Sequence, residues 1–165
     1  MSEFVGGIVT DGPIVDDRIK DIISIASNAV IPPEITVAMS RVLTAVADQM
    51  DKEHITANMP VCCLFSNSDT FTISLTGCEQ AICLRTAMYS IPNLVKTIGT
   101  DKLYTILAEE LCHLIWDIRD EVLVNFKVLD VLRNISPDLQ MTNIYSPQEV
   151  AACHTYLRDH PAFWA

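Results

Sequence analysis

The sequence predicts an α+β fold that is mostly helical. Apolar residues recur at helical spacing in several long segments, one short region is rich in β-forming residues, and prolines and glycines separate the two kinds of segment. The chain has 165 residues, 50% of them hydrophobic, which is enough to bury a core. We expect a flexible N-terminus over residues 1–12 and a single globular domain over residues 13–165.

An N-terminal helical hairpin is expected first. Its first helix begins at Pro13 and ends at Pro32-Pro33, because proline disfavours the helical conformation of the residue before it. Pro33 suits the first turn of the second helix, which continues to Met50. The short connection predicts that the two helices pack as a pair. The apolar residues that define the first helix are Val15, Ile19, Ile22, Ile23, Ala26 and Val30.

A small antiparallel sheet is expected next. Residues 60–65 (PVCCLF) and 70–75 (TFTISL) are short and rich in β-formers, and the polar residues 66–69 between them favour a turn. This arrangement predicts a β-hairpin whose first strand is buried on both faces. Residues 78–88 fit either a helix, begun by a capping box at 76–79, or a third strand.

One long central helix and a C-terminal helix complete the expected fold. Residues 101–134 contain no glycine or proline and repeat apolar residues at helical spacing, which predicts a helix about 50 Å long at about 1.5 Å per residue. A short helical piece over residues 93–98 precedes it. The run Ser146-Pro147-Gln148-Glu149 combines an N-cap, a proline at the first helical position and a glutamate at the third, and predicts a last helix to about Arg158.

Composition excludes several classes of function. The net charge is −10 and the pI is about 4.6, which argues against nucleic-acid binding, because that affinity depends on Lys and Arg. No run of 18 apolar residues predicts a membrane span, and the acidic start lacks the positive region of a signal peptide, so we expect a cytoplasmic protein. The six cysteines include no Cys-x-x-Cys pair and are interpreted as buried, reduced thiols.

Residues 106–121, ILAEELCHLIWDIRDE, concentrate the side chains capable of chemistry. On a helix, Asp117 and Glu121 fall within about 20° of Glu110, beside the apolar stripe. Glu109 and His113 are four residues apart and stack on one face, as do His113 and Asp117. The pattern is typical both of a metal site and of the wet border of an amphipathic helix, and both interpretations stay open here.

The run Ile-Leu-Ala-Glu109-Glu110-Leu-Cys-His113 resembles the active-site helix of zincin-like metallopeptidase domains, whose motif is His-Glu-x-x-His. The resemblance covers about residues 60–132 and includes the acid-containing segment DEVLVNFKVLDVL. It implies that Glu110 is the general base and His113 a zinc ligand. Glu109 stands where the first histidine of the motif belongs, so it is either an unusual ligand or a relic. The resemblance therefore implies a zinc-dependent peptidase or its catalytically degenerate descendant.

A catalytic zinc ion takes three protein ligands and keeps one position open. Glu109 and His113 are two candidates, and Asp117, one turn further along, is the third. Glu121 follows His113 by eight residues, about 12 Å along a straight helix, so it reaches the same ion only if the helix breaks. Other suppliers of a ligand elsewhere in the chain are His154, His160 and Asp138.

Two other classes of function remain open from the sequence. The first is a non-enzymatic interaction or oligomerisation protein, without a cofactor, which binds a protein or peptide partner or its own copy. There Trp116, which lies off the apolar stripe, would mark a docking surface. The second is a degenerate all-α nucleotide pyrophosphohydrolase, which EELCHLIWDI followed by KVLDVL faintly resembles. Glu110-x-x-His113 and Lys127-x-x-Asp130 would fill the slots of its four metal-binding carboxylates, and Lys127 would repel the ion.

Overall fold

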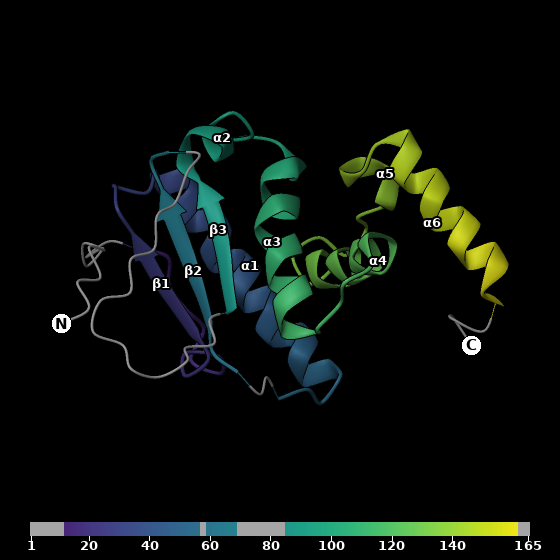
Figure 1. Ribbon diagram of the computed structural model, residues 1–165, viewed down its shortest axis with the longest axis horizontal. Helices are drawn as coiled ribbons and strands as arrows, with labels where there is room; N and C mark the ends of the chain where they lie inside the picture. The colour runs from purple at the N-terminus through teal and green to yellow at the C-terminus, as the bar shows by residue number, and fades with distance from the viewer. Residues whose placement is uncertain (1–11, 57–58, 69–84, 162–165) are drawn as a thin grey trace, which may run out of the picture.

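The computed structural model describes residues 12–56, 59–68 and 85–161, and the α+β class expected from the sequence is confirmed there (Figure 1). Residues 1–11, on which the expected flexible N-terminus falls, lie outside the described residues. The elements are β1 (Ile23–Ser27), α1 (Pro33–Lys52), β2 (Val61–Ser66), β3 (Arg85–Ser90), α2 (Ile91–Val95), α3 (Asp101–Ile115), α4 (Glu121–Leu132), α5 (Met141–Ile144) and α6 (Pro147–Asp159).

The sheet corrects the expected antiparallel hairpin. Its three strands run in the order β1-β2-β3 and all pair in parallel, with Ile23 opposite Val61 and Val61 opposite Arg85. Parallel strands need a long crossover, and α1 supplies it between β1 and β2. The second strand of the expected hairpin, residues 70–75, lies outside the described residues. Of the ambiguous segment 78–88, the described part, from Arg85 on, is strand.

The expected N-terminal helical hairpin is also wrong in its first half. Residues 17–22 form turns and Ile23–Ser27 form β1. Ile22, Ile23 and Ile25 are β-branched and suit a strand, and β2 offers the backbone partners that a helix would not use. The second helix is confirmed as α1, which begins with Pro33 in its first turn and buries a long apolar face.

The expected central helix is two helices. α3 ends at Ile115 and α4 begins at Glu121, and residues 116–120 form a bend that we call the elbow. Asp117 in the elbow has φ 53°, a left-handed conformation that Asp adopts more readily than most residues. Asp120 is the N-cap of α4, and its Oδ1 accepts hydrogen bonds from the backbone N–H groups of Val122 and Leu123.

The sheet holds α3 in place through β3. The ring of Tyr89 in β3 stacks on Phe65 of β2 at 5.0 Å, and its hydroxyl donates a 2.9 Å hydrogen bond to the carbonyl of Leu107. Figure 1 shows the sheet at one end of the molecule, α5 and α6 at the other, and α3 and α4 between them. α1 packs against both α3 and α4, so α3 is fixed from two sides.

The C-terminal helix is confirmed as α6. Its capping box is complete: the backbone N–H of Ser146 donates to Glu149 Oε2 at 2.7 Å, and Ser146 Oγ accepts from the backbone N–H of Glu149 at 3.3 Å. α6 packs on α4, away from the sheet. Within the described residues, no helix has the length and apolar content that crossing a membrane requires.

Candidate metal centre

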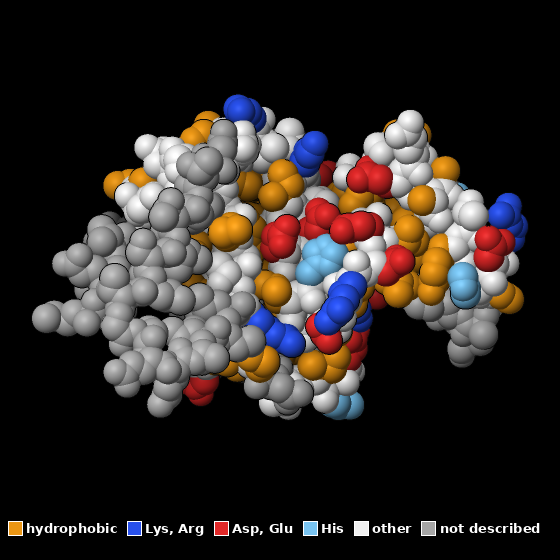
Figure 2. Space-filling model, in the orientation of Figure 1, with side chains coloured by type: hydrophobic (Ala, Val, Ile, Leu, Met, Phe, Trp, Pro, Cys, Tyr) orange, Lys and Arg blue, Asp and Glu red, His pale blue; other side chains and the backbone are white. Residues whose placement is uncertain are grey.

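Glu109, His113 and Glu121 bring one ligand atom each to a common point on α3 and α4. These three atoms lie within 4.8 Å of one another, and His113 Nε2 is 3.6 Å from Glu121 Oε2. Figure 2 shows a histidine in the middle of this face, with acidic side chains above it and Lys or Arg side chains below it. We call these three residues the Glu-His-Glu cluster.

The elbow makes the cluster possible. Glu109 and His113 lie one turn apart on α3, and Glu121 is the first residue of α4. In one straight helix, His113 and Glu121 would be separated by about 12 Å. The chain instead turns at Asp117, and the Asp120 cap starts α4 in a new direction. The sequence analysis required a helix break for Glu121 to reach the same ion as His113. This break exists, and it places Glu121 beside His113.

The imidazole of His113 is oriented by the same elbow. Its Nδ1 lies 2.6 Å from the carbonyl oxygen of Ile118, which can only accept a hydrogen bond. We therefore assign the hydrogen to Nδ1, which in the neutral ring leaves the Nε2 lone pair facing Glu121. Histidine ligands of metals are commonly held in this way, with one ring N–H donated to a carbonyl or carboxylate.

The cluster carries more negative than positive charge. Partial burial raises the pKa of Glu109, and the charges of Glu121 and Glu110 raise it further, while His113 opposes them. A nearby cation stabilises the ionised form of a carboxylate in this position. Within the three-residue cluster, His113 is the one basic group. The electrostatics of the site therefore suit a positively charged ligand.

The geometry fits one ion after a small side-chain movement. Two ligands at about 2.1 Å from the same ion can be at most about 4.2 Å apart. The pair of His113 and Glu121 already meets this limit at 3.6 Å. The cluster extends to 4.8 Å, and Glu121, whose side chain is 76% exposed, is free to rotate inward. Two carboxylates and one imidazole suit zinc, manganese or iron(II), and three protein ligands leave room for water.

The other ligand candidates lie elsewhere. Asp117 is exposed and points toward β3, with its Oδ1 4.0 Å from Arg85 Nη2. His160 stacks on Tyr156 at 4.2 Å at the end of α6, while His154 and Asp138 are exposed and are not among the residues that meet at the cluster. Sequence reasoning admitted Glu121 as a ligand only if the helix breaks, and the break exists. Its signal was the Asp120 N-cap before an apolar run, which is typical of a helix start.

A hollow of about 600 Å³ lies beside Glu109. It separates the first half of α3 from the junction of α5 and α6, and its walls are mostly polar. It leaves one side of Glu109 accessible to a small ligand. Its lining includes Lys102, Thr105, Ile106, Glu109, Tyr145 and Glu149.

Trp116 does not stand free as a docking residue. Its indole Nε1 donates a 2.7 Å hydrogen bond to Glu53 Oε2 at the end of α1, and Lys127 Nζ lies 5.3 Å from the centre of its ring. The off-stripe tryptophan is therefore used within the chain, to join α1 to the elbow. No spacing in the sequence predicts this contact, because Glu53 and Trp116 are 63 residues apart.

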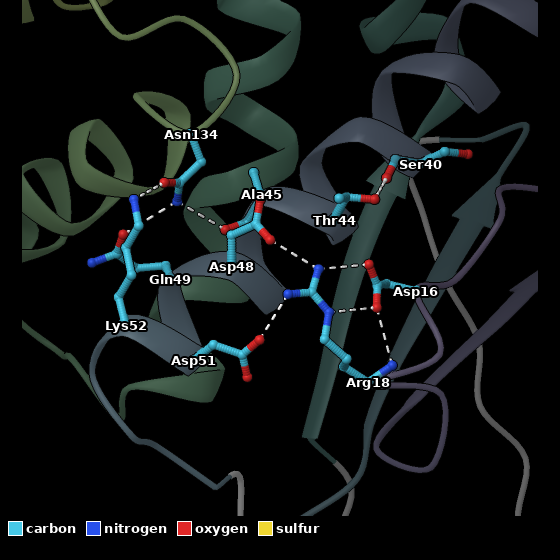
Figure 3. Close-up of polar contacts among 10 residues, drawn as sticks. All are labelled: Asp16, Arg18, Ser40, Thr44, Ala45, Asp48, Gln49, Asp51, Lys52 and Asn134. Carbon is cyan, nitrogen blue, oxygen red and sulfur yellow. Dashed lines mark hydrogen bonds and ion pairs between the residues drawn. The ribbon is translucent and has the colours of Figure 1, made fainter.

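A second group of carboxylates lies where α1 meets the segment before β1. Arg18 Nη2 is 2.8 Å from Asp16 and 2.9 Å from Asp48, and its Nη1 is 2.7 Å from Asp51 (Figure 3). Hydrogen bonds from Arg18 lower the pKa of Asp16 to about 2. We call these four residues the Arg18 cluster. It joins the segment before β1 to α1.

No family model, no curated protein and no solved structure matches this chain. The residues and their geometry are therefore the basis on which a function can be assigned.

Proposed function

We propose that the chain is a zincin-like, metal-dependent peptidase domain in which Glu109, His113 and Glu121 hold one divalent cation. The observation that supports the proposal is the meeting of three ligand atoms within 4.8 Å, two of them from the Glu-Glu-x-x-His motif and one from the next helix. Glu109 takes the position of the first histidine of the zincin motif as a carboxylate ligand. The ion is zinc, or another metal that accepts mixed nitrogen and oxygen ligands.

In the proposed site, each side chain has a separate task. A divalent cation held there would polarise a substrate carbonyl and lower the pKa of a bound water. Glu110, which follows Glu109 on α3 and is exposed, would be the general base for such a water. His113 keeps its Nε2 directed at the cluster through its bond to Ile118. The hollow beside Glu109 is the approach for a peptide.

The all-α nucleotide pyrophosphohydrolase has less support than this proposal. The chain contains a parallel sheet, which an all-α fold lacks. Lys127 and Asp130, which would complete that metal site, are not in the Glu-His-Glu cluster, and Lys127 is bonded to Glu53.

Metal analysis of the purified, untagged protein tests the proposal. We expect one zinc or other transition-metal ion per chain in the wild type and in Glu110→Gln. We expect its loss in Glu109→Gln, His113→Ala and Glu121→Gln, since two remaining ligands hold an ion poorly. His154→Ala is the matched control, because His154 is an exposed histidine outside the cluster. A wild type that binds none of these metals, or a Glu121→Gln variant that keeps its metal, would contradict the proposal.

Turnover separates an active enzyme from a degenerate one. A library of fluorogenic peptides, incubated with the zinc-loaded protein, should be cleaved by the wild type and not by Glu110→Gln, which keeps the metal and lacks the base. Cleavage that survives in Glu110→Gln would exclude Glu110 as the base. A metal-loaded wild type that cleaves no peptide would be a degenerate zincin-like domain, and interaction with a partner would then be its remaining function.

A further inference from the structure

We propose that Glu53 is a positioning residue for the Glu-His-Glu cluster, which acts through Trp116 and Lys127 on the elbow. This inference rests on the proposed metal site. Glu53 is not one of the three ligand candidates, so its effect on a metal would be exerted only through the arrangement of α3 and α4.

Glu53 joins the two sides of the elbow with its two carboxylate oxygens. Oε2 accepts the 2.7 Å hydrogen bond from Trp116 Nε1, and Oε1 accepts a 2.5 Å hydrogen bond from Lys127 Nζ. Trp116 is the C-cap of α3, and Lys127 lies in the middle of α4. Lys127 also lies over the tryptophan ring, so the three side chains form a closed triangle that spans the bend.

The triangle lies close in sequence to the cluster it would position. Trp116 follows His113 by three residues, and Lys127 follows Glu121 by six, fewer than two helical turns. The relative direction of α3 and α4 sets the distance between His113 and Glu121. Two other bonds of the elbow, from Asp120 to its own helix and from His113 to Ile118, are local. Arg85 of β3 supports the elbow from the sheet, by a 2.7 Å hydrogen bond to the carbonyl of Leu114 and a 4.0 Å pair with Asp117. Glu53 adds a support from α1, a separate element.

The Glu53 carboxylate is itself firmly held. Its side chain is 27% exposed and that of Lys127 is 17% exposed, so solvent screens their pairing only in part. Burial raises the pKa of Glu53, but the hydrogen bonds from Lys127, Gln49 and Trp116 together lower it below its usual value. Gln49 donates to Glu53 at 2.6 Å from one turn earlier on α1.

The network continues to the far end of α4. Gln49 Oε1 accepts a 3.2 Å hydrogen bond from Asn134 Nδ2, and Asn134 Oδ1 accepts one from Lys52 Nζ (Figure 3). Asn134 also donates to the backbone carbonyl of Ala45 at 3.1 Å. The end of α1 is therefore hydrogen-bonded to the middle of α4, at Lys127, and to Asn134, just after the end of α4. Glu53 is the member of this network that also reaches Trp116, the C-cap of α3.

The experiment compares the zinc affinity of Glu53→Gln with that of the wild type, by competition with a chromophoric chelator. Loss of an outer residue that positions metal ligands costs about 10–100-fold in affinity, and we expect a loss of at least about tenfold here. Trp116→Phe keeps the ring and removes the N–H donor, and it should weaken zinc in the same direction. Glu34→Gln is the matched control, since Glu34 is an exposed glutamate at the other end of α1 and should leave affinity unchanged.

A second readout is independent of metal. In the metal-free wild type, the ¹⁵N shifts of the His113 ring should report hydrogen on Nδ1, as the bond to Ile118 requires. In Glu53→Gln we expect a mixture of tautomers, because the elbow is less constrained. A change in the ring shifts, together with a wild type that binds no zinc, would remove the proposed function and leave the positioning role of Glu53. Wild-type affinity and unchanged shifts in folded Glu53→Gln and Trp116→Phe would overturn the inference, whatever their thermal stability.

Discussion

The two clusters of charged side chains in this molecule differ in how their carboxylates are balanced. In the Arg18 cluster, three aspartates surround one guanidinium, which is charged at every accessible pH. In the Glu-His-Glu cluster, two glutamates share one imidazole, which is charged only when protonated. The pKa of Asp16 is accordingly lowered by its hydrogen bonds to Arg18, while the pKa of Glu109 is raised by burial and by neighbouring acids.

The difference separates a structural cluster from a candidate functional one. The charged form of a carboxylate is stabilised when it is paired with a fixed cation, and the pair stabilises the segments it joins. The charged form of a partly buried carboxylate with acidic neighbours is destabilised, and proteins commonly keep such arrangements at functional sites. A divalent cation bound to the Glu-His-Glu cluster would stabilise its carboxylates as Arg18 stabilises the three aspartates. Metal addition and charge removal should therefore affect the two clusters in different ways.

The largest expected effect is stabilisation by zinc. Free zinc at a hundred times its dissociation constant should raise the free energy of unfolding by about 2.7 kcal/mol. For a domain of this size that corresponds to a rise in Tm of roughly 5–10 °C, which differential scanning fluorimetry measures. Asp48→Asn, in the Arg18 cluster, should show the same rise, and Glu121→Gln should show none. An equal zinc response in Glu121→Gln would place the ion elsewhere.

Next in size is the loss of the central cation of the Arg18 cluster. Arg18→Gln removes three partly exposed ion pairs, each worth about 0.2–1 kcal/mol, and should lower the free energy of unfolding by about 1–2 kcal/mol. Urea titration measures the difference. Lys20→Gln is the matched control, because among the described residues Lys20 pairs with the exposed Asp17 alone, at 3.3 Å, and its loss should change stability by less than about 0.5 kcal/mol. Equal effects of the two variants would show that the Arg18 cluster adds nothing beyond ordinary surface pairs.

A smaller effect is expected when one acid in each cluster is neutralised. The change in the free energy of unfolding should have opposite signs in the two clusters. In metal-free protein at pH 7, Glu109→Gln should raise the free energy of unfolding, because it removes a charge that burial and Glu121 disfavour. Asp16→Asn should lower it, by less than about 1 kcal/mol, since the pair with Arg18 is partly exposed. Chemical denaturation with a chelator present measures both. A destabilising Glu109→Gln would mean that the Glu-His-Glu cluster is already balanced without an ion.

The elements predicted correctly are those determined by local sequence. α1 and α6 have proline at their first turn, and α6 has a capping box that the structure reproduces. The strand β1 was mistaken for a helix because Ile19, Ile22, Ile23 and Ala26 also fit helical spacing. Its pairing with β2, 38 residues further along the chain, decides the outcome. Strand direction was missed for the same reason, since it depends on the crossover through α1.

The candidate site was predicted in part. Glu109 and His113 are neighbours on α3, as helical spacing requires. Glu121 could not be placed, because an unbroken apolar repeat hid the elbow and neither glycine nor proline marks it. The bend depends on an aspartate with positive φ, an aspartate cap and a triangle of side chains from distant parts of the chain. Of these, only the Asp120 cap leaves a local signal.

The smallest expected effect is the pH dependence of the same two substitutions, and it tests the comparison at the level of protons. The pKa of Asp16 falls from 3.8 to about 2 on folding, so its stabilisation is complete above pH 3.8 and is lost as the pH falls through about 2. The difference between wild type and Asp16→Asn should therefore stay constant from pH 7 to about 4 and then shrink. For Glu109 the pKa is raised on folding, so the cost of its charge disappears as the pH falls from neutral through that raised pKa. The advantage of Glu109→Gln should thus shrink before Asp16 begins to titrate. Urea titrations of the metal-free proteins at pH 7, 5.5, 4 and 2.5 measure both differences. If the effect of Asp16→Asn were lost at a higher pH than that of Glu109→Gln, the Arg18 cluster could not be the balanced one and the Glu-His-Glu cluster the one short of a cation.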